Sequence, residues 1–102
     1  MPQTDFDYRG IDEVIHGRVR LAIVAYLSGA GSAGFSELKK RAGVNDGNLS
    51  VHLRKLEEAG YIDIEKRFVG RKPQTVCCLS DAGREAWIAY IDHIQSLLAS
   101  KD

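Results

Sequence analysis

The sequence predicts a mainly α-helical fold of the α+β class, with a three-helix core, a two-stranded β-hairpin and a long C-terminal helix. Three observations carry this prediction. Apolar residues recur at helical spacing between residues 11 and 59, the period changes to two between residues 62 and 79, and a broad apolar stripe at helical spacing follows residue 80. A chain of 102 residues has room for one domain with a single modest core.

The N-terminal part of the chain divides at residue 10. Residues 1–10 are mostly polar and show no period, so we expect a flexible arm. From Ile11 the pattern is helical as far as Leu27, with a break at Gly17, because glycine inside a helix costs about 1 kcal/mol relative to alanine. Residues 28–34 (SGAGSAG) are small and flexible, and they predict a loop.

Two helices separated by a short turn are expected next. Ser36 can cap a short helix over residues 37–42, and Gly43 ends it. A longer helix then covers residues 45–59. A short helix, a turn containing glycine and a longer helix have the spacing of a helix-turn-helix, whose second helix can read DNA.

The longer of these two helices is amphipathic. Leu49, Leu53 and Leu56 recur at i, i+4 and i+7, so one face packs inward and the polar face is left outside. Either Asn45 or Asp46 can accept hydrogen bonds from the first-turn amides, and Gly60 supplies a left-handed exit. About 14 residues give a helix of roughly 21 Å, which is long enough to lie in a major groove.

A basic β-hairpin follows Gly60. Ile62, Ile64 and Phe68 fall on one face of the first strand, and residues 70–73 (GRKP) supply the turn. Residues 74–79 return as the partner strand. The hairpin carries a cluster of cations with no acid among them: Lys66, Arg67, Arg71 and Lys72.

The C-terminal helix is expected over residues 81–100, with Ser80 as its cap. Its stripe at heptad-like spacing consists of Trp87, Ile91, Ile94 and Leu98, and Ile88, Tyr90 and Leu97 broaden it. A stripe this broad must be buried against something, partly its own domain and partly a second copy of the chain. The expected organisation is therefore an arm (1–10), a winged helix-turn-helix (11–80) and a helix for dimerisation (81–102).

Composition restricts the class of protein. The formal net charge is zero, with 14 basic and 14 acidic residues, which argues against a nucleic-acid binder unless the basic residues are clustered. No apolar run approaches the roughly 20 residues that span a bilayer, and the first residues lack a secretory signal, so a cytoplasmic protein without a membrane partner is expected. Two adjacent cysteines fit a reducing compartment.

Neither an enzyme nor a metal protein is expected. His16, His52 and His93 lie far apart, and no pair of them has metal-ligand spacing. Cys77 and Cys78 point to opposite faces of a strand, so they cannot hold one tetrahedral ion together. We predict a structural role for Cys77, with Cys78 left open as a reactive thiol, and no cofactor.

Three stretches resemble the small winged-helix regulators of bacteria and archaea, close to the MarR-type and ArsR-type families. They are residues 49–61 (LSVHLRKLEEAGY), residues 66–73 (KRFVGRKP) and residues 79–84 (LSDAGR), and the likeness extends from about Ile11 to Leu98. The resemblance implies a dimeric DNA-binding transcription regulator. It does not name an operator, a regulated gene or a signal.

The chain departs from these families at three points. Relatives often carry Arg or Lys where this chain has Val51, which offers at most a contact to a thymine methyl. Full-length MarR-type proteins have extra helices around a ligand cleft, and this shorter chain leaves a small-molecule effector undetermined. Metal-sensing ArsR-type proteins place cysteines on the helix that corresponds to residues 37–42, which has none here.

Two surfaces are therefore predicted. The DNA-binding surface comprises Lys39, Asn45, Asp46, Asn48, Ser50, Val51, Arg54, Lys55, Arg67, Arg71 and Lys72. The dimer interface comprises Trp87, Tyr90, Ile91, Ile94 and Leu98. The alternative is a winged helix that binds another protein and not DNA, which the neutral net charge and Val51 favour.

Overall fold

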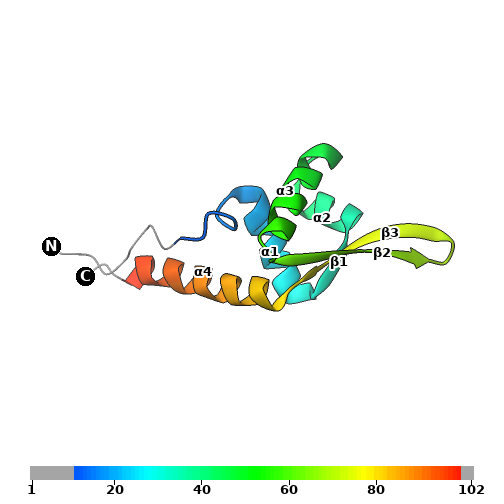
Figure 1. Ribbon diagram of the computed structural model, residues 1–102. Coiled ribbons are helices and arrows are strands. Elements are labelled where there is room, and N and C mark those ends of the chain that lie inside the picture. The colour runs from blue at the N-terminus through cyan, green and yellow to red at the C-terminus, as the bar shows by residue number, and fades with distance from the viewer. Residues whose placement is uncertain (1–10, 100–102) are drawn as a thin grey trace.

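The computed structural model describes residues 11–99, so the predicted arm at residues 1–10 lies outside the described residues. Its elements, in chain order, are α1 (Arg18–Ala30), β1 (Ser32–Gly34), α2 (Phe35–Ala42), α3 (Asp46–Glu58), β2 (Ile62–Val69), β3 (Lys72–Leu79) and α4 (Asp81–Ala99). In Figure 1, α1, α2 and α3 gather near the base of the sheet, while α4 and the β2–β3 hairpin extend in opposite directions. The predicted α+β fold with a winged helix-turn-helix is confirmed.

The core lies between the helices and the base of the sheet. Each of the first three helices contributes its apolar face, as the helical spacing predicts. The buried side chains are Ile15, Val19, Ile23, Val24, Leu27, Ala33, Leu38, Ala42, Leu49, Leu53, Leu56, Ile62, Cys77 and Tyr90.

The prediction of a loop over residues 28–34 is wrong. Helix α1 continues to Ala30, and Gly31 ends it with a φ of 84°. Residues 32–34 form β1, which pairs antiparallel with β3 and makes a three-stranded sheet of order β1-β3-β2. Ala33 lies opposite Cys77 in this register and is buried, so tertiary pairing overrides the low strand propensity of small residues.

Helix α2 begins at Phe35, two residues earlier than predicted, because β1 leads directly into it. Its N-cap is Gly34, which has no side chain to accept a hydrogen bond. Ser36 is therefore a residue of the first turn, and its predicted capping role is wrong. The predicted end is confirmed, since Gly43 has a left-handed φ of 69° and its N–H donates to the carbonyl of Lys39.

The β2–β3 hairpin, hereafter the wing, has a tighter turn than predicted. Val69 pairs with Lys72, so only Gly70 and Arg71 form the turn, and Gly70 has the positive φ of 64° that two-residue hairpins favour. Phe68, predicted on the inward face, is 75% exposed. Its parity matches that of Ile62, but the wing extends beyond the helices, and residues 11–99 leave the ring of Phe68 mostly uncovered there.

The segment before α1 is fixed to the body by Asp12. One carboxylate oxygen accepts hydrogen bonds from the amides of Val14 and Ile15, at 2.8 and 3.3 Å. The other oxygen accepts from the hydroxyl of Tyr61 at 2.5 Å, and this bond is the main reason why the pKa of Tyr61 is raised to about 12. Helix α1 begins directly after the predicted break, with Gly17 as its N-cap. The helical piece predicted from Ile11 to this break is wrong, because residues 11–16 form turns and not a helix.

The start of α4 is tied to the end of α3. The hydroxyl of Ser80 accepts from the amide of Gly83 at 2.9 Å and donates to the carbonyl of Gly60 at 2.6 Å, so the predicted cap is confirmed. The amide of Ser80 also donates to the carbonyl of Tyr61 at 2.9 Å. This close approach leaves no room for a side chain at Gly83, which is buried.

Candidate nucleic-acid interface

Helix α3 presents its predicted polar face to solvent. Leu49, Leu53 and Leu56 are buried, and the opposite face is exposed, including Val51 at 48%. The exposed residues of that face are Asn48, Ser50, Val51, Arg54 and Lys55. Amide, hydroxyl, methyl and guanidinium groups therefore lie together on one accessible side of a regular helix, which is the chemistry that reads base edges.

Both ends of α3 are held in place. The side chain of Asn45 accepts from the amide of Asn48 at 2.8 Å, so Asn45 is the cap and Asp46 is a residue of the first turn. At the other end Gly60 has a φ of 82° and its N–H donates to the carbonyl of Glu57. The Asn45 side chain is consequently occupied by its own helix, although it is exposed.

Arg20 anchors α3 from the side of α1. Its Nε donates to the carbonyl of Val14 at 2.5 Å, and its guanidinium lies 3.0 Å from Nδ1 of His52. The pKa of His52 is lowered, first by burial and then by the charge of Arg20. His52 therefore favours its neutral form and accepts from Arg20. Arg20 and His52 lie 32 residues apart in the sequence, so no local pattern predicts this link between α1 and α3.

The cations of α2 are partly engaged within the protein. Lys39 forms an ion pair with Asp46 at 2.7 Å, which joins α2 to the start of α3 and lowers the net charge that these two predicted contacts offer to DNA. The guanidinium of Arg41 lies 4.7 Å from the ring centroid of Tyr26, whose hydroxyl donates to Glu37. The positive charge of α2 is therefore partly balanced by these contacts.

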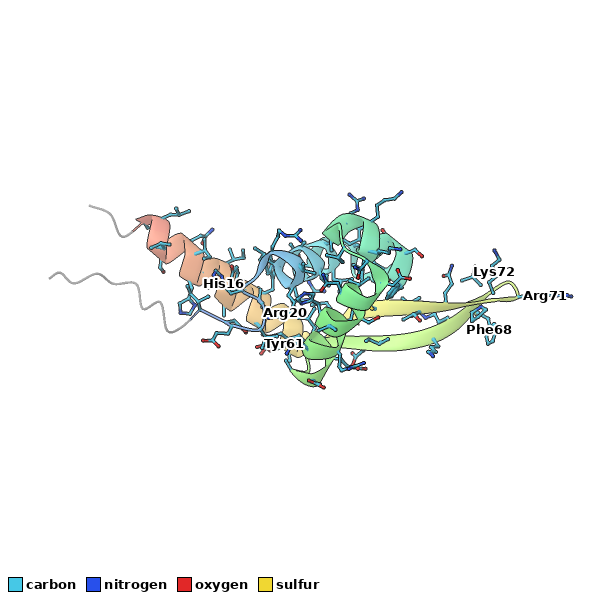
Figure 2. All side chains as sticks on the ribbon, turned by 90° about the horizontal axis from the view of Figure 1, so that it is seen from above. His16, Arg20, Tyr61, Phe68, Arg71 and Lys72 are labelled. Carbon is cyan, nitrogen blue, oxygen red and sulfur yellow. The ribbon has the colours of Figure 1, made fainter. Side chains whose placement is uncertain are left out.

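The wing carries its charge unevenly. Arg67 forms an ion pair with Glu65 at 2.9 Å, and both project from the same face of β2. Lys66 lies on the other face, which is the face of Ile62 and Ile64. Within residues 11–99, the side chains of Arg71 and Lys72 have no hydrogen-bond or ion-pair partner. Figure 2 shows Arg71 pointing away from the end of the wing.

A shallow depression of about 410 Å³ joins the exposed face of α3 to the wing. Its lining residues are Phe35, Ser50, Leu53, Arg54, Glu57, Ile64, Lys66 and Thr75. Ser50 and Arg54 come from α3 and Lys66 comes from β2, so the polar helix face and a wing cation border one surface. The sequence predicts Lys66 in the basic cluster but not among the DNA contacts. Lys66 lies two residues from Ile64 and so on the same face of β2, and this spacing could have placed it beside α3.

The apolar stripe of α4 divides between the core and the surface. Tyr90 is 5% exposed, its hydroxyl lies 2.9 Å from Nδ1 of His16, and its ring stacks on Trp87 with 5.9 Å between centroids. The prediction that Tyr90 lies in a dimer interface is therefore corrected, because its side chain is buried in the core of its own protomer. Ile91 and Ile94 pack partly on the core, whereas Leu98 is 71% exposed.

The adjacent cysteines face opposite ways, as predicted. Cys77 is fully buried, and burial raises the pKa of its thiol to about 11, while Cys78 is partly exposed. In the part of the chain that the structure describes, no three His, Cys, Asp or Glu side chains converge on a point where a metal ion could bind. None of the helices within residues 11–99 combines the length and the apolarity needed to span a bilayer.

A helix-turn-helix followed by a projecting hairpin defines the winged-helix class. The sequence model of the winged helix DNA-binding domain family matches residues 19–98. The chain therefore belongs to this family, and it is a DNA-binding transcription regulator and not an enzyme. The predicted likeness to winged-helix regulators is confirmed.

The chain is also similar to an uncharacterized relative and to solved structures with the same fold. The chain is 34% identical to the uncharacterized protein MJ0432 of Methanocaldococcus jannaschii, over 83% of this chain and 92% of that protein. The transcriptional regulator homologue protein from Pyrococcus horikoshii OT3 superposes with a TM-score of 0.79 at 28% identity, covering 85% and 86% of the two chains. The overoxidized AbfR bound to DNA has a TM-score of 0.69 at 19% identity, covering 78% of this chain and 57% of AbfR, so it shares the fold alone.

Proposed function

We propose that the protein acts as a homodimer on double-stranded DNA of defined sequence, with α3 in the major groove and the wing against the backbone or the minor groove. One observation carries this proposal. Ser50 and Arg54 of the exposed α3 face and Lys66 of the wing border the same shallow depression, so a polyanion with readable base edges could contact helix and wing together.

Each exposed group of α3 has a matching partner on DNA. The amide of Asn48 can bond bidentately to adenine, and the guanidinium of Arg54 to guanine or to a phosphate. The methyl groups of Val51 can contact a thymine methyl. Lys55, Lys66, Arg71 and Lys72 supply charge for phosphates and fix the register of the protein on the duplex. Base contacts from α3 would thus give specificity, and the cations would give affinity.

Dimerisation through α4 is the second part of the proposal. Ile88 and Leu98 are 55% and 71% exposed, and Trp87, Ile91 and Ile94 are only partly buried against the core. A second copy related by a two-fold axis would cover this stripe. Two copies of α3 would then enter successive major grooves roughly 34 Å apart. The DNA-bound state of the structural neighbour AbfR supports DNA as the ligand of this fold.

The test is a gel shift with DNA fragments that flank the gene for this protein, repeated across salt concentrations. If the dimer neutralises about six to ten phosphates, its affinity should fall by roughly three to five orders of magnitude between 50 and 200 mM salt. Absence of binding at low ionic strength would reject the proposal.

The rival function is a winged helix that docks a protein through α4. Its support is the exposed apolar stripe of α4 together with the zero net charge. Charge reversal at Arg54, Arg71 and Lys72 separates the two functions, because it should abolish DNA retention and leave a complex held by α4 intact. Arg84→Glu is the control for Arg54→Glu, since Arg84 is also exposed but lies on α4 and not on α3. Equal losses in both variants would point to overall charge and not to a surface.

A further inference from the structure

The outer part of the wing carries apolar side chains that nothing in the described chain covers. Phe68 is 75% exposed and Val69 57% exposed. Pro73, the cross-strand partner of Phe68, is also exposed. Strand positions this exposed can be occupied by a polar β-former such as threonine, so the burial of Phe68 in its own protomer does not account for the aromatic ring.

The register separates this apolar surface from most of the charge. Phe68 and Pro73 share one face of the two-stranded ribbon, while Val69 and Lys72 share the other. Figure 2 shows Phe68 and Lys72 pointing to opposite sides of the wing, with Arg71 beyond its end. The wing tip therefore carries the aromatic ring on one face and Lys72 and Arg71 on the other face and at the end, while Lys66 lies on the face of Phe68, two residues further from the tip.

The charge around Phe68 selects the kind of partner. Residues 66–75 contain four cations and no acid, and among the ion pairs of residues 11–99 only Arg67 of these four takes part, with Glu65. Such a tip attracts a polyanion. The minor groove of DNA lies between two rows of phosphates, and proteins that bind there often insert Phe or Pro between base steps. An apolar protein pocket would lack this match to the cations.

We propose that Phe68 is an apolar wedge that enters the minor groove beside the α3 site and partly unstacks one base step, while Arg71 and Lys72 hold the flanking phosphates. This inference rests on the proposed DNA-binding function. Pyrimidine–purine steps unstack most easily, so the DNA under the wing should favour TA or CA steps at a position that no polar side chain reads.

The experiment uses a duplex selected by the full-length protein from a random pool, with 2-aminopurine placed at the steps under the wing. Binding of the wild type should raise 2-aminopurine fluorescence. Phe68→Ala should remove this rise and weaken binding by about tenfold or more per wing, because a buried aromatic side chain is lost from the complex. The slope of log affinity against log salt should stay unchanged, since no charge is removed.

Two variants serve as controls. Val69→Thr alters an exposed apolar side chain next to Phe68 but on the opposite face, and it should keep the fluorescence rise. Arg71→Ala should reduce the salt slope by about 0.9 per wing, because one phosphate contact is lost from each. All three positions are exposed, so the variants should melt like the wild type.

The outcomes are distinct. Wild-type protein that binds no duplex overturns the proposed function and this inference with it. Wild-type protein that binds, with Phe68→Ala matching it in affinity and fluorescence, overturns the wedge alone. If Phe68→Ala changes the oligomeric mass and not the DNA affinity, Phe68 belongs to a protein contact and the wedge is again overturned.

Discussion

Gly83 is the position where the packing of α4 against the end of α3 can be tested most sharply. A Cβ on this residue would lie 2.1 Å from the carbonyl oxygen of Tyr61 and 2.9 Å from Cδ1 of Leu79. The carbonyl of Tyr61 cannot move away freely, because it accepts a hydrogen bond from the amide of Ser80. Helix α4 must therefore shift in a Gly83→Ala variant. Overpacking of this kind costs about 1–3 kcal/mol, and weakening the Ser80 bond costs about 1 kcal/mol more.

Alanine has a higher helix propensity than glycine, which offsets about 1 kcal/mol of this cost. We therefore expect Gly83→Ala to lower the free energy of unfolding by about 1–3 kcal/mol. Gly29→Ala is the matched control, because Gly29 is exposed within α1 and a Cβ there meets nothing within 4 Å. That variant should gain about 0.5–1 kcal/mol. Urea unfolding followed by circular dichroism, at one fixed protein concentration, measures both. A Gly83→Ala variant as stable as Gly29→Ala would refute the packing described here.

Three further predictions concern local contacts. Tyr61→Phe should cost about 1–2 kcal/mol at neutral pH, because Asp12 loses its donor. The pKa of Tyr61 is raised from 10.0 to about 12, so this contribution is present below pH 10 and is lost as the pH rises through 12; denaturation of wild type and variant across that window should converge. Asn45→Ala should lower stability by about 0.5–2 kcal/mol and Asn45→Ser should restore most of it, as thermal melts would show. Iodoacetamide should label Cys78 in the folded protein and spare Cys77, whose burial raises its pKa to about 11; equal labelling in peptide mass maps would contradict the placement of Cys77 in the core.

Sequence patterns predicted the elements whose cause is local. The leucine spacing of α3, the Asn45 cap and the glycines that end α2 and α3 each follow from a few neighbouring residues. Strand β1 could not be predicted this way, because Ser32, Ala33 and Gly34 have little strand propensity. Their pairing with β3 makes them a strand, and this pairing has no local signal because the partners lie 42 to 46 positions later, from Gly34 with Val76 to Ser32 with Cys78.

The site shows the same division. Parity correctly places Phe68 on the face of Ile62, but parity cannot say that the wing extends beyond the helices and leaves Phe68 exposed. Heptad-like spacing finds the stripe of α4 but cannot divide it between the core and a partner. Tyr90 lies in the core because its hydroxyl contacts His16 and its ring stacks on Trp87. Charge counting cannot reveal that Glu65 pairs with Arg67.

The central claim is that the exposed face of α3 and the wing together contact DNA. Amide chemical-shift mapping on the protein, at low salt and with a duplex chosen from a random pool, tests it most directly. We expect the largest changes at Asn48, Ser50, Arg54 and the wing tip around Arg71, with α4 unaffected. Changes confined to α4, or none at a duplex excess, would contradict the claim.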